Sequence, residues 1–136
     1  MKKLIIIIAM SLPLPSRAMN NIECMASAMY HEARGEGEHG MLAVAHTILN
    51  RSRKSHLSVC QTIRKRGQFS FVKRGVLPHA PREYSLLAMQ AIRGYNRGMD
   101  SSKGATFFVF HKRKPKWLKG MKRTVRVGSH NFFKEK

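Results

Sequence analysis

Acidic side chains are scarce in this chain. Its 136 residues include seven Asp and Glu against 26 Lys and Arg, which gives a formal net charge of +19. The sequence also lacks an internal repeat and a low-complexity linker, so its length fits one domain with a modest core. A positive charge this large attracts a small protein to polyanions, among which nucleic acid is the usual candidate.

A transmembrane run is missing too. The main apolar run, at residues 4–10, is too short to span a bilayer, which takes about 20 residues. Two lysines precede this run, and residues 16–18 (Ser-Arg-Ala) place small residues where a signal peptidase needs them. We therefore expect an export signal over residues 1–18 and a folded domain over residues 19–136. A buried N-terminal strand is the alternative, although two prolines after the run argue against it.

Export changes the expected partner of the positive charge. An exported protein meets polyanions in the cell envelope, as lipopolysaccharide, teichoic acids or the peptide carboxylates of peptidoglycan. We expect such anionic envelope polymers, and no specific nucleic acid, as partners of a monomer in the periplasm, in the cell wall or outside the cell. The cations are densest at residues 64–66, 112–114 and 119–126, where a solvated surface without a specific ligand is the alternative.

Cysteine occurs only twice, as Cys24 and Cys60. Neither has a second cysteine or a histidine at ligand spacing, so the sequence does not predict a zinc site. In an oxidising compartment the pair could form a disulfide that closes a loop of about 35 residues and stabilises the fold by roughly 3–4 kcal/mol. Two buried thiols are the alternative.

Three of the seven carboxylates lie together in the segment His31–Glu38, as Glu32, Glu36 and Glu38. Glu32 ends an apolar helical stretch just before a glycine-rich turn. An apolar setting raises the pKa of a carboxyl group and suits it to general acid catalysis, whereas an exposed glutamate at a helix end is the alternative. A zinc protease would need a histidine where this chain has Gly35, so we expect neither a metal nor another cofactor.

Hydrophobic periodicity predicts an α+β fold that is mainly helical. We expect one helix from an N-cap at Asn20-Asn21 to Gly35, a second along Met41–Leu49, a helical turn at Val59–Ile63, and a third helix from Pro81 to Gly94 and Gly98. Asn50 and Arg51 are expected to cap or brace the second helix.

The last third of the chain changes to a strand pattern. Short strands are expected at Thr106–Phe110 and Thr124–Val127. They would form a small C-terminal β-hairpin unit, which Asn131–Phe133 closes.

A series of short elements runs along the chain in a fixed order: Tyr30–Glu36, Ala43–Ala45, Ile48–Arg51, Val59-Cys60, Gly67–Ser70, Gly104–Phe108, Pro115–Trp117 and Gly128–Phe132. Their order and spacing resemble the SleB/CwlJ-type cell-wall hydrolases over roughly residues 22–133. The two cysteines resemble a branch of that family in which they are paired. Compact basic members with a leader also resemble bacteriophage endolysins.

The resemblance implies a lysozyme- or lytic-transglycosylase-like helical core and a peptidoglycan glycosidase activity. It implies cleavage of the β-1,4 bond between N-acetylmuramic acid and N-acetylglucosamine, with Glu32 as the catalytic glutamate and glycan strands as the substrate. A non-enzymatic cationic protein that binds polyanions is the alternative, but the charge alone does not explain the cluster of acids.

Two mechanisms are open. Most glycosidases use a second carboxylate, and Glu36 could face the same side as Glu32 if the helix continued through Gly35. A lytic transglycosylase needs only Glu32, first as acid and then as base, and it forms a 1,6-anhydro product without water. The scarcity of acids favours this second mechanism. Glu36 would then be a structural or orienting group, paired with Arg34 or Arg51.

Five further residues are candidates for substrate binding. Gln68 and Ser70 could form hydrogen bonds with the N-acetyl and hydroxyl groups of the sugars. Phe108 and Trp117 offer flat faces for sugar rings, although core packing is the alternative. His130 could contact the substrate or orient the glutamate, or it could be a structural histidine.

Overall fold

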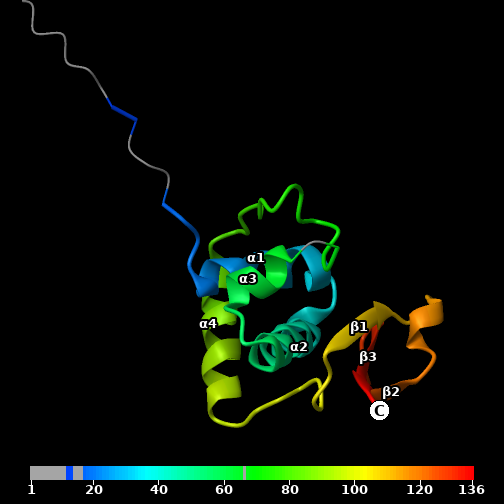
Figure 1. The fold of residues 1–136 in the computed structure, drawn as a ribbon. Helices are drawn as coiled ribbons and strands as arrows, with labels where there is room; N and C mark the ends of the chain where they lie inside the picture. Colours follow the sequence, from blue (N-terminus) through cyan, green and yellow to red (C-terminus); the bar gives the residue numbers. More distant parts are fainter. Residues whose placement is uncertain (1–11, 14–16, 66) are drawn as a thin grey trace, which may run out of the picture.

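The computed structural model describes residues 12–13, 17–65 and 67–136, and most of the expected export signal lies outside these residues. The described chain folds into four α-helices followed by a three-stranded sheet (Figure 1): α1 (Asn21–Ala33), α2 (Gly37–Ser55), α3 (Val59–Arg64), α4 (Glu83–Asn96), β1 (Phe107–Phe110), the 3-10 turn η1 (Lys116–Leu118), β2 (Met121–Val127) and β3 (His130–Glu135). The predicted α+β class, mainly helical, is confirmed. None of the described helices has both the length and the apolar character needed to cross a membrane.

The predicted start of α1 is confirmed in detail. The Asn20 side chain accepts a hydrogen bond from the Glu23 amide at 2.9 Å, and the Glu23 carboxylate accepts one from the Asn20 amide at 2.8 Å. Such a reciprocal pair satisfies two amides that have no partner inside the helix. A disulfide joins Cys24 of α1 to Cys60 of α3, as expected for the oxidised pair.

The helix α1 forms the centre of the helical layer, because it packs against α2, α3 and α4. Its residues from Cys24 to Met29 are all buried, and Met25 and Met29 are completely so. Burial decreases at Tyr30, His31 and Glu32, where the helix leaves the core. The last turn of α1 therefore carries Glu32 from an apolar interior to the edge of the layer.

The ends of α4 differ from the prediction. The helix begins at Glu83, two residues after Pro81. The Pro81 and Arg82 carbonyls accept hydrogen bonds from the amides three residues farther along the chain, a pattern that forms a turn before the helix. Gly94 does not terminate the helix but lies inside it, where an added Cβ would come within 3.2 Å of the Met99 sulfur. Gly98, with φ of +96°, follows the end of the helix as predicted.

The sheet is larger than the predicted hairpin unit. Its strands are antiparallel in the order β1-β3-β2, so the segment expected only to close the domain is part of the central strand. The strand β2 begins at Met121, three residues before its predicted start, and its pairing with β3 shifts between Arg123 and Val125. This bulge and the exposed cations of β2 hid the alternating pattern from the sequence. Phe132, at the centre of β3, is completely buried.

Candidate active site

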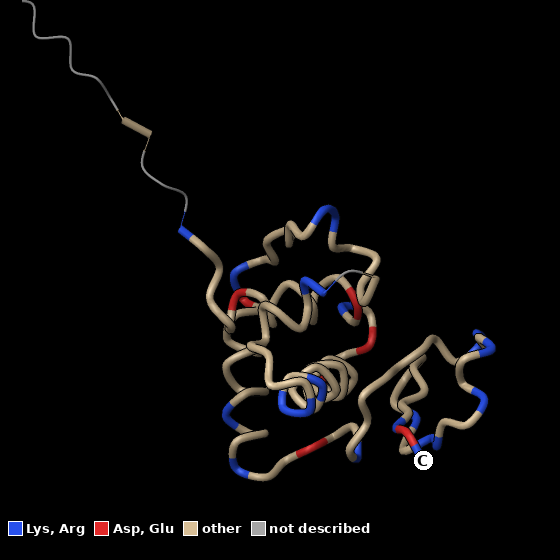
Figure 2. The backbone as a smooth tube through the Cα atoms, in the orientation of Figure 1, with Lys and Arg blue, Asp and Glu red and all other residues tan. Residues whose placement is uncertain are grey.

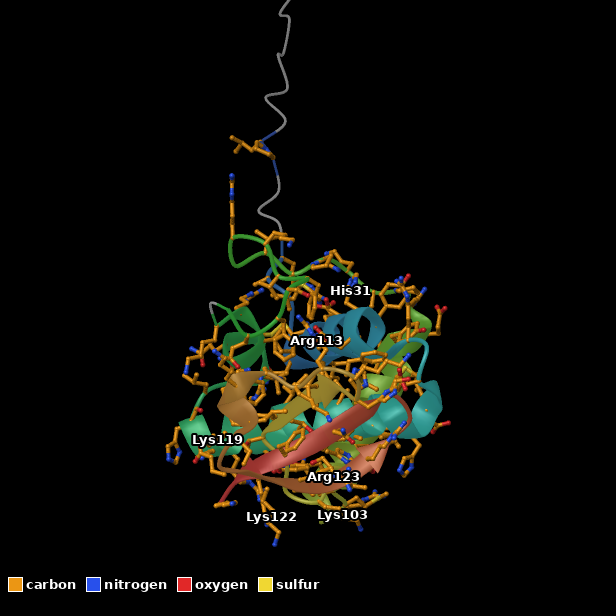
Figure 3. The ribbon with its side chains drawn as sticks, turned by 90° about the vertical axis from the view of Figure 1, so that its right-hand side faces the viewer. His31, Lys103, Arg113, Lys119, Lys122 and Arg123 are labelled. Atoms are coloured by element: carbon orange, nitrogen blue, oxygen red, sulfur yellow. A yellow bond between two sulfur atoms is a disulfide. The ribbon has the colours of Figure 1, made fainter. Side chains whose placement is uncertain are left out.

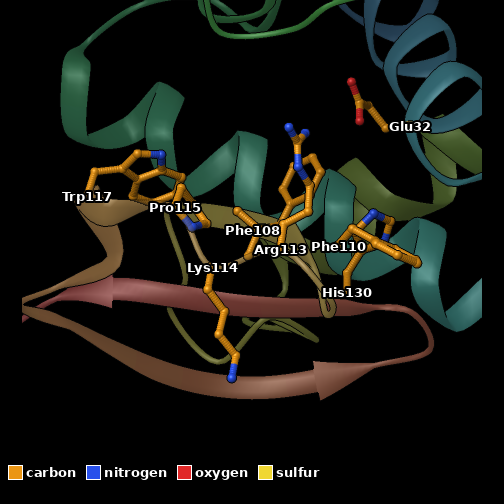
Figure 4. A pocket seen from close by; sticks show the side chains of 9 residues that line it. Glu32, Phe108, Phe110, Arg113, Lys114, Pro115, Trp117 and His130 are labelled. Carbon is orange, nitrogen blue, oxygen red and sulfur yellow. The ribbon is translucent and has the colours of Figure 1, made fainter.

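A cavity of about 540 Å³ lies where the end of α1 faces β1 and the loop that follows it (Figure 4). This volume is within the range of roughly 300–1,000 Å³ typical of small-molecule sites. We call it the Glu32 pocket, and its lining residues are Glu32, Phe108, Val109, Phe110, Arg113, Lys114, Pro115, Trp117 and His130. Glu32 is the one carboxylate among them.

Burial raises the pKa of Glu32, and the charge of Arg51 partly opposes this effect by lowering it. The net direction is upward, so a larger fraction of Glu32 is protonated near neutral pH than for an ordinary glutamate. The ion pairs among the described residues are Arg17–Glu23 and Lys54–Glu135, and neither involves Glu32. Glu32 is therefore placed to give a proton to a ligand.

Arg51 does not line the Glu32 pocket, but its charge acts on Glu32, and several contacts hold its side chain. Its Nε donates to the Thr106 carbonyl and its Nη1 to the Gln68 side chain at 2.9 Å. Its guanidinium also lies 5.0 Å from the ring centre of Phe107. Burial lowers the pKa of Arg51 to about 10, which still leaves it cationic at neutral pH. Arg51 thus extends from α2 to other elements, a role beyond the expected bracing of its own helix.

Glu36 does not line the pocket. The helix α1 ends at Ala33 and Gly37 has φ of +74°, so helical geometry does not continue from Glu32 to Glu36. The Glu36 carboxylate accepts a hydrogen bond from the Ser129 amide at 2.8 Å. The expected pairing of Glu36 with Arg34 or Arg51 was wrong for this reason.

The Glu36–Ser129 hydrogen bond joins the α1–α2 junction to the turn between β2 and β3. A Cβ on Gly128 would come within 2.3 Å of the Glu36 carboxylate oxygen, and Gly128 has φ of +55°. Only glycine accommodates both conditions without strain. Figure 2 draws Asp and Glu in red, and red segments lie at this α1–α2 junction, although acidic residues are few in the chain.

His130 begins β3 and faces the Glu32 pocket, with 8% of its surface exposed. Its Nδ1 has no hydrogen-bond partner among the described residues, and its ring lies edge-on to Phe108 at 5.3 Å. Burial lowers the pKa of His130, and nearby Glu36 only partly opposes this. The pocket wall therefore contains a largely buried imidazole whose neutral form is favoured and whose buried Nδ1 has no hydrogen-bond partner among the described residues.

The other sequence candidates separate into two groups. Phe108 and Trp117 line the pocket with Glu32 and His130, and Trp117 is 50% exposed, so its face is accessible. Gln68 instead binds Arg51 and lines two neighbouring cavities. Ser70 is exposed and lies outside the Glu32 pocket.

Two further cavities extend the pocket. One of about 450 Å³ shares Phe108 and Trp117 with the Glu32 pocket. A third, of about 230 Å³, shares Arg51, Gln68 and Phe107 with the second. The three cavities therefore adjoin one another, with Phe108 and Trp117 between the first two and Arg51, Gln68 and Phe107 between the second and the third.

Sequence reasoning missed Arg113 and Lys114 as pocket residues. They were counted only as part of a basic cluster, since the sequence does not show on which side of the sheet the loop lies. No group of three or more His, Cys, Asp and Glu side chains among the described residues is placed to hold a metal ion.

The structure is thus a small α+β domain with a desolvated carboxylate, Glu32, in a pocket where the helices face the sheet. The chain is a member of the cell wall hydrolase family, whose sequence profile matches residues 35–133. The SleB/CwlJ-type resemblance of its motifs is thereby confirmed. The matched range begins three residues after Glu32, so the family match itself does not include that residue.

Comparisons with individual proteins agree with the family. The chain is 34% identical to a spore cortex-lytic enzyme of Halalkalibacterium halodurans and 32% identical to one of Bacillus subtilis, over 116 residues each. These alignments cover 83% of this chain but only 34% and 37% of those proteins, so the chain spans about a third of their length.

Solved structures show the same fold. The catalytic domain of the germination-specific lytic transglycosylase SleB from Bacillus anthracis superposes with a TM-score of 0.72 at 27% identity, covering 89% of this chain and 99% of that one. The catalytic domain of Bacillus cereus SleB gives a TM-score of 0.71 at the same identity, with 89% and 94% coverage.

Proposed function

We propose that this protein degrades peptidoglycan as a lytic transglycosylase, cleaving the β-1,4 bond between N-acetylmuramic acid and N-acetylglucosamine through Glu32. The observation that carries the proposal is a single half-buried carboxylate with a raised pKa in the Glu32 pocket. The similarity to the catalytic domain of a lytic transglycosylase supports it.

The reaction needs one group that first gives and then takes a proton. Protonated Glu32 donates to the glycosidic oxygen, and the bond from that oxygen to C1 of muramic acid breaks. The Glu32 carboxylate then takes the proton from the C6 hydroxyl, whose oxygen bonds to C1 and forms the 1,6-anhydro ring. No water is consumed, and Glu32 ends protonated as it began.

The two influences on Glu32 suit both steps. Burial favours the protonated form that the first step requires. The charge of Arg51 stabilises the carboxylate that forms during the first step and acts as base in the second. Arg51 therefore acts through Glu32, as a positioning residue.

The alternative is a hydrolytic muramidase with Glu36 as the second carboxylate. In glycosidases that use two carboxylates, the pair flanks the scissile bond at a separation of roughly 5–10 Å, with both groups facing the substrate. Glu36 instead binds the Ser129 amide and does not line the pocket. This arrangement favours a mechanism with one acid.

Neutral and aromatic side chains complete the proposed substrate site. Phe108 and Trp117 stack against sugar rings, and His130, which lines the same pocket, contacts the glycan or orients Glu32. Gln68 lines a neighbouring cavity that shares Phe108 and Trp117 with the pocket, and there it contacts a more distant sugar. Ser70 is the weakest of the proposed contacts because it lies outside the pocket.

This function requires export, so the proposal includes a signal peptide at residues 1–18 and action of a monomer at the cell wall. The positive surface holds the protein on anionic envelope polymers. The proposal includes a role like that of bacteriophage endolysins, which the strong positive charge favours.

The test is mass spectrometry of the soluble products released from purified peptidoglycan sacculi. We expect fragments ending in 1,6-anhydromuramic acid from the native protein and none from Glu32→Gln. Glu38→Gln, which neutralises an exposed glutamate of the same segment, is the matched control and should release them normally. Reducing muramic acid ends would mean hydrolysis, and equal release by Glu32→Gln would exclude Glu32.

A further inference from the structure

The loop after β1 carries a cation into the Glu32 pocket from the side opposite Glu32. In Figure 4 the guanidinium of Arg113 rises into the pocket, whereas Lys114 extends away over the sheet. The Arg113 amide donates to the Phe110 carbonyl at 2.9 Å, which closes a tight turn. The His111 amide donates to the Ser129 carbonyl at 2.7 Å and ties this turn to the β2–β3 turn. The backbone that presents Arg113 is therefore well anchored.

Arg113 has no carboxylate partner within the described part of the chain. The ion pairs there are Arg17–Glu23 and Lys54–Glu135, and the one carboxylate of the pocket, Glu32, is not paired with Arg113. Arg113 is also exposed, so its donors are available to a ligand. An unpaired guanidinium is a strong site for a carboxylate, because its planar donors can bind both oxygens at once.

The proposed substrate carries carboxylates on the sugar whose bond is cleaved. Muramic acid carries a peptide through the lactyl group on C3, and this stem peptide has free carboxylates. The same sugar must bring its C1 to Glu32, so its peptide leaves the ring within the Glu32 pocket. A phosphate polymer linked at C6 is a poorer match, because the proposed ring closure needs a free hydroxyl there.

We propose that Arg113 is a substrate-specificity residue that binds a carboxylate of the stem peptide, so that the enzyme selects peptide-bearing glycan over glycan with neutral substituents. This inference rests on the proposed function for its substrate. Phe108 and Trp117 stack against the sugar rings, and Arg113 binds the peptide carboxylate beside them.

The experiment compares native sacculi with sacculi whose carboxylates have been converted to neutral amides by carbodiimide coupling with ammonia. On native sacculi, Arg113→Gln should raise KM about tenfold with little change in kcat, the size of a lost charge-assisted hydrogen bond. On amidated sacculi, native protein and Arg113→Gln should be equal. Lys112→Gln is the matched control, since Lys112 is an exposed cation of the same loop that does not line the pocket.

Binding is measured as well, by sedimentation of Glu32→Gln and Glu32→Gln/Arg113→Gln with the same two preparations. This readout needs no turnover, so it tests Arg113 even if the proposed transglycosylase activity is absent. Equal losses of binding for Arg113→Gln and Lys112→Gln would mean that Arg113 contributes only general charge attraction, and would overturn the proposal. A loss that persists on amidated sacculi, or that disappears only when phosphate polymers are stripped with acid, would overturn the carboxylate assignment.

Discussion

The helical layer and the sheet differ in how they are stabilised, and each contributes a different part of the pocket. In the helical layer, α1 is buried along most of its length and a disulfide ties it to α3. In the sheet, most residues of β2 are exposed or half-buried, and its surface carries several cations, among them Lys122 and Arg123, which Figure 3 places on one side with Lys119. The helical layer contributes Glu32 to the pocket, and the sheet with the loop after β1 contributes the rest of the lining, including Phe108 and His130.

Several contacts join these two layers, among them the Lys54–Glu135 ion pair and the packing of Phe132 in the same core as the helices. Glu36 binds Ser129, Arg51 binds the Thr106 carbonyl, and the Thr124 hydroxyl donates to the Ser102 carbonyl at 2.6 Å. We expect the free energy of unfolding to depend mainly on the helical layer, and the shape of the pocket to depend on these contacts between the layers. Changes in each region should therefore separate the two properties.

The largest expected effect on stability comes from the helical layer. Replacing Cys24 and Cys60 together by serine should lower the free energy of unfolding by roughly 3–4 kcal/mol. Denaturant unfolding followed by circular dichroism measures this change. Activity at a temperature where the variant remains folded should stay near that of the native protein, because neither cysteine approaches the pocket. An unchanged midpoint would mean that the helical layer does not depend on the disulfide.

The link through Glu36 should have the next largest effect. Glu36→Ala removes the acceptor of the Ser129 amide and should cost about 1–3 kcal/mol of stability with a clear loss of activity. Gly128→Ala should resemble it, since the new methyl group would meet the Glu36 carboxylate.

Glu36→Gln is the informative control for that link. Its side-chain oxygen can still accept from Ser129, so activity should stay within about threefold of the native value. Glycan release measured for Glu36→Ala, Gly128→Ala and Glu36→Gln shows whether the hydrogen bond or the charge of Glu36 matters for activity. A complete loss in Glu36→Gln would show that the charge itself is required, as in a two-carboxylate hydrolase.

Arg51 should affect the pH dependence of the activity. Its charge lowers the pKa of Glu32, so Arg51→Met should raise that pKa further. Because the first step needs protonated Glu32, the alkaline limb of the kcat/KM profile should move to higher pH. Arg53→Met, on an exposed cation of the same helix, is the control, and a shift to lower pH in Arg51→Met would contradict the assignment.

The smallest expected effect is on the stability contributed by Glu32 itself. Burial raises its pKa in the folded state above the unfolded value, so folding favours the protonated form and stability falls as pH rises through this interval. Glu32→Gln should therefore be slightly more stable than the native protein at neutral pH, by less than about 1 kcal/mol, and equal to it below the unfolded pKa. Thermal unfolding at two pH values measures the difference.

The sequence predicted local features better than contacts between distant segments. The N-cap of α1, the stripe of α2 and the acid at the end of an apolar helix depend on neighbouring residues, and each was found. The order of the strands was missed because the residues of a strand do not determine which other strand it pairs with. Arg113 was missed as a pocket residue for the same reason, since a turn places it, and so was the contact of Arg51 with the Thr106 carbonyl.

The central position of β3 also has a consequence for the order in which the protein is made. The strands β1 and β2 pair with β3 and not with each other, so neither has a sheet partner until β3 leaves the ribosome. The helices through Asn96 pack against one another directly and need no strand for these contacts. The helical layer, with Glu32 at its edge, can therefore form first, and the wall of the Glu32 pocket is completed only when β3 joins β1 and β2.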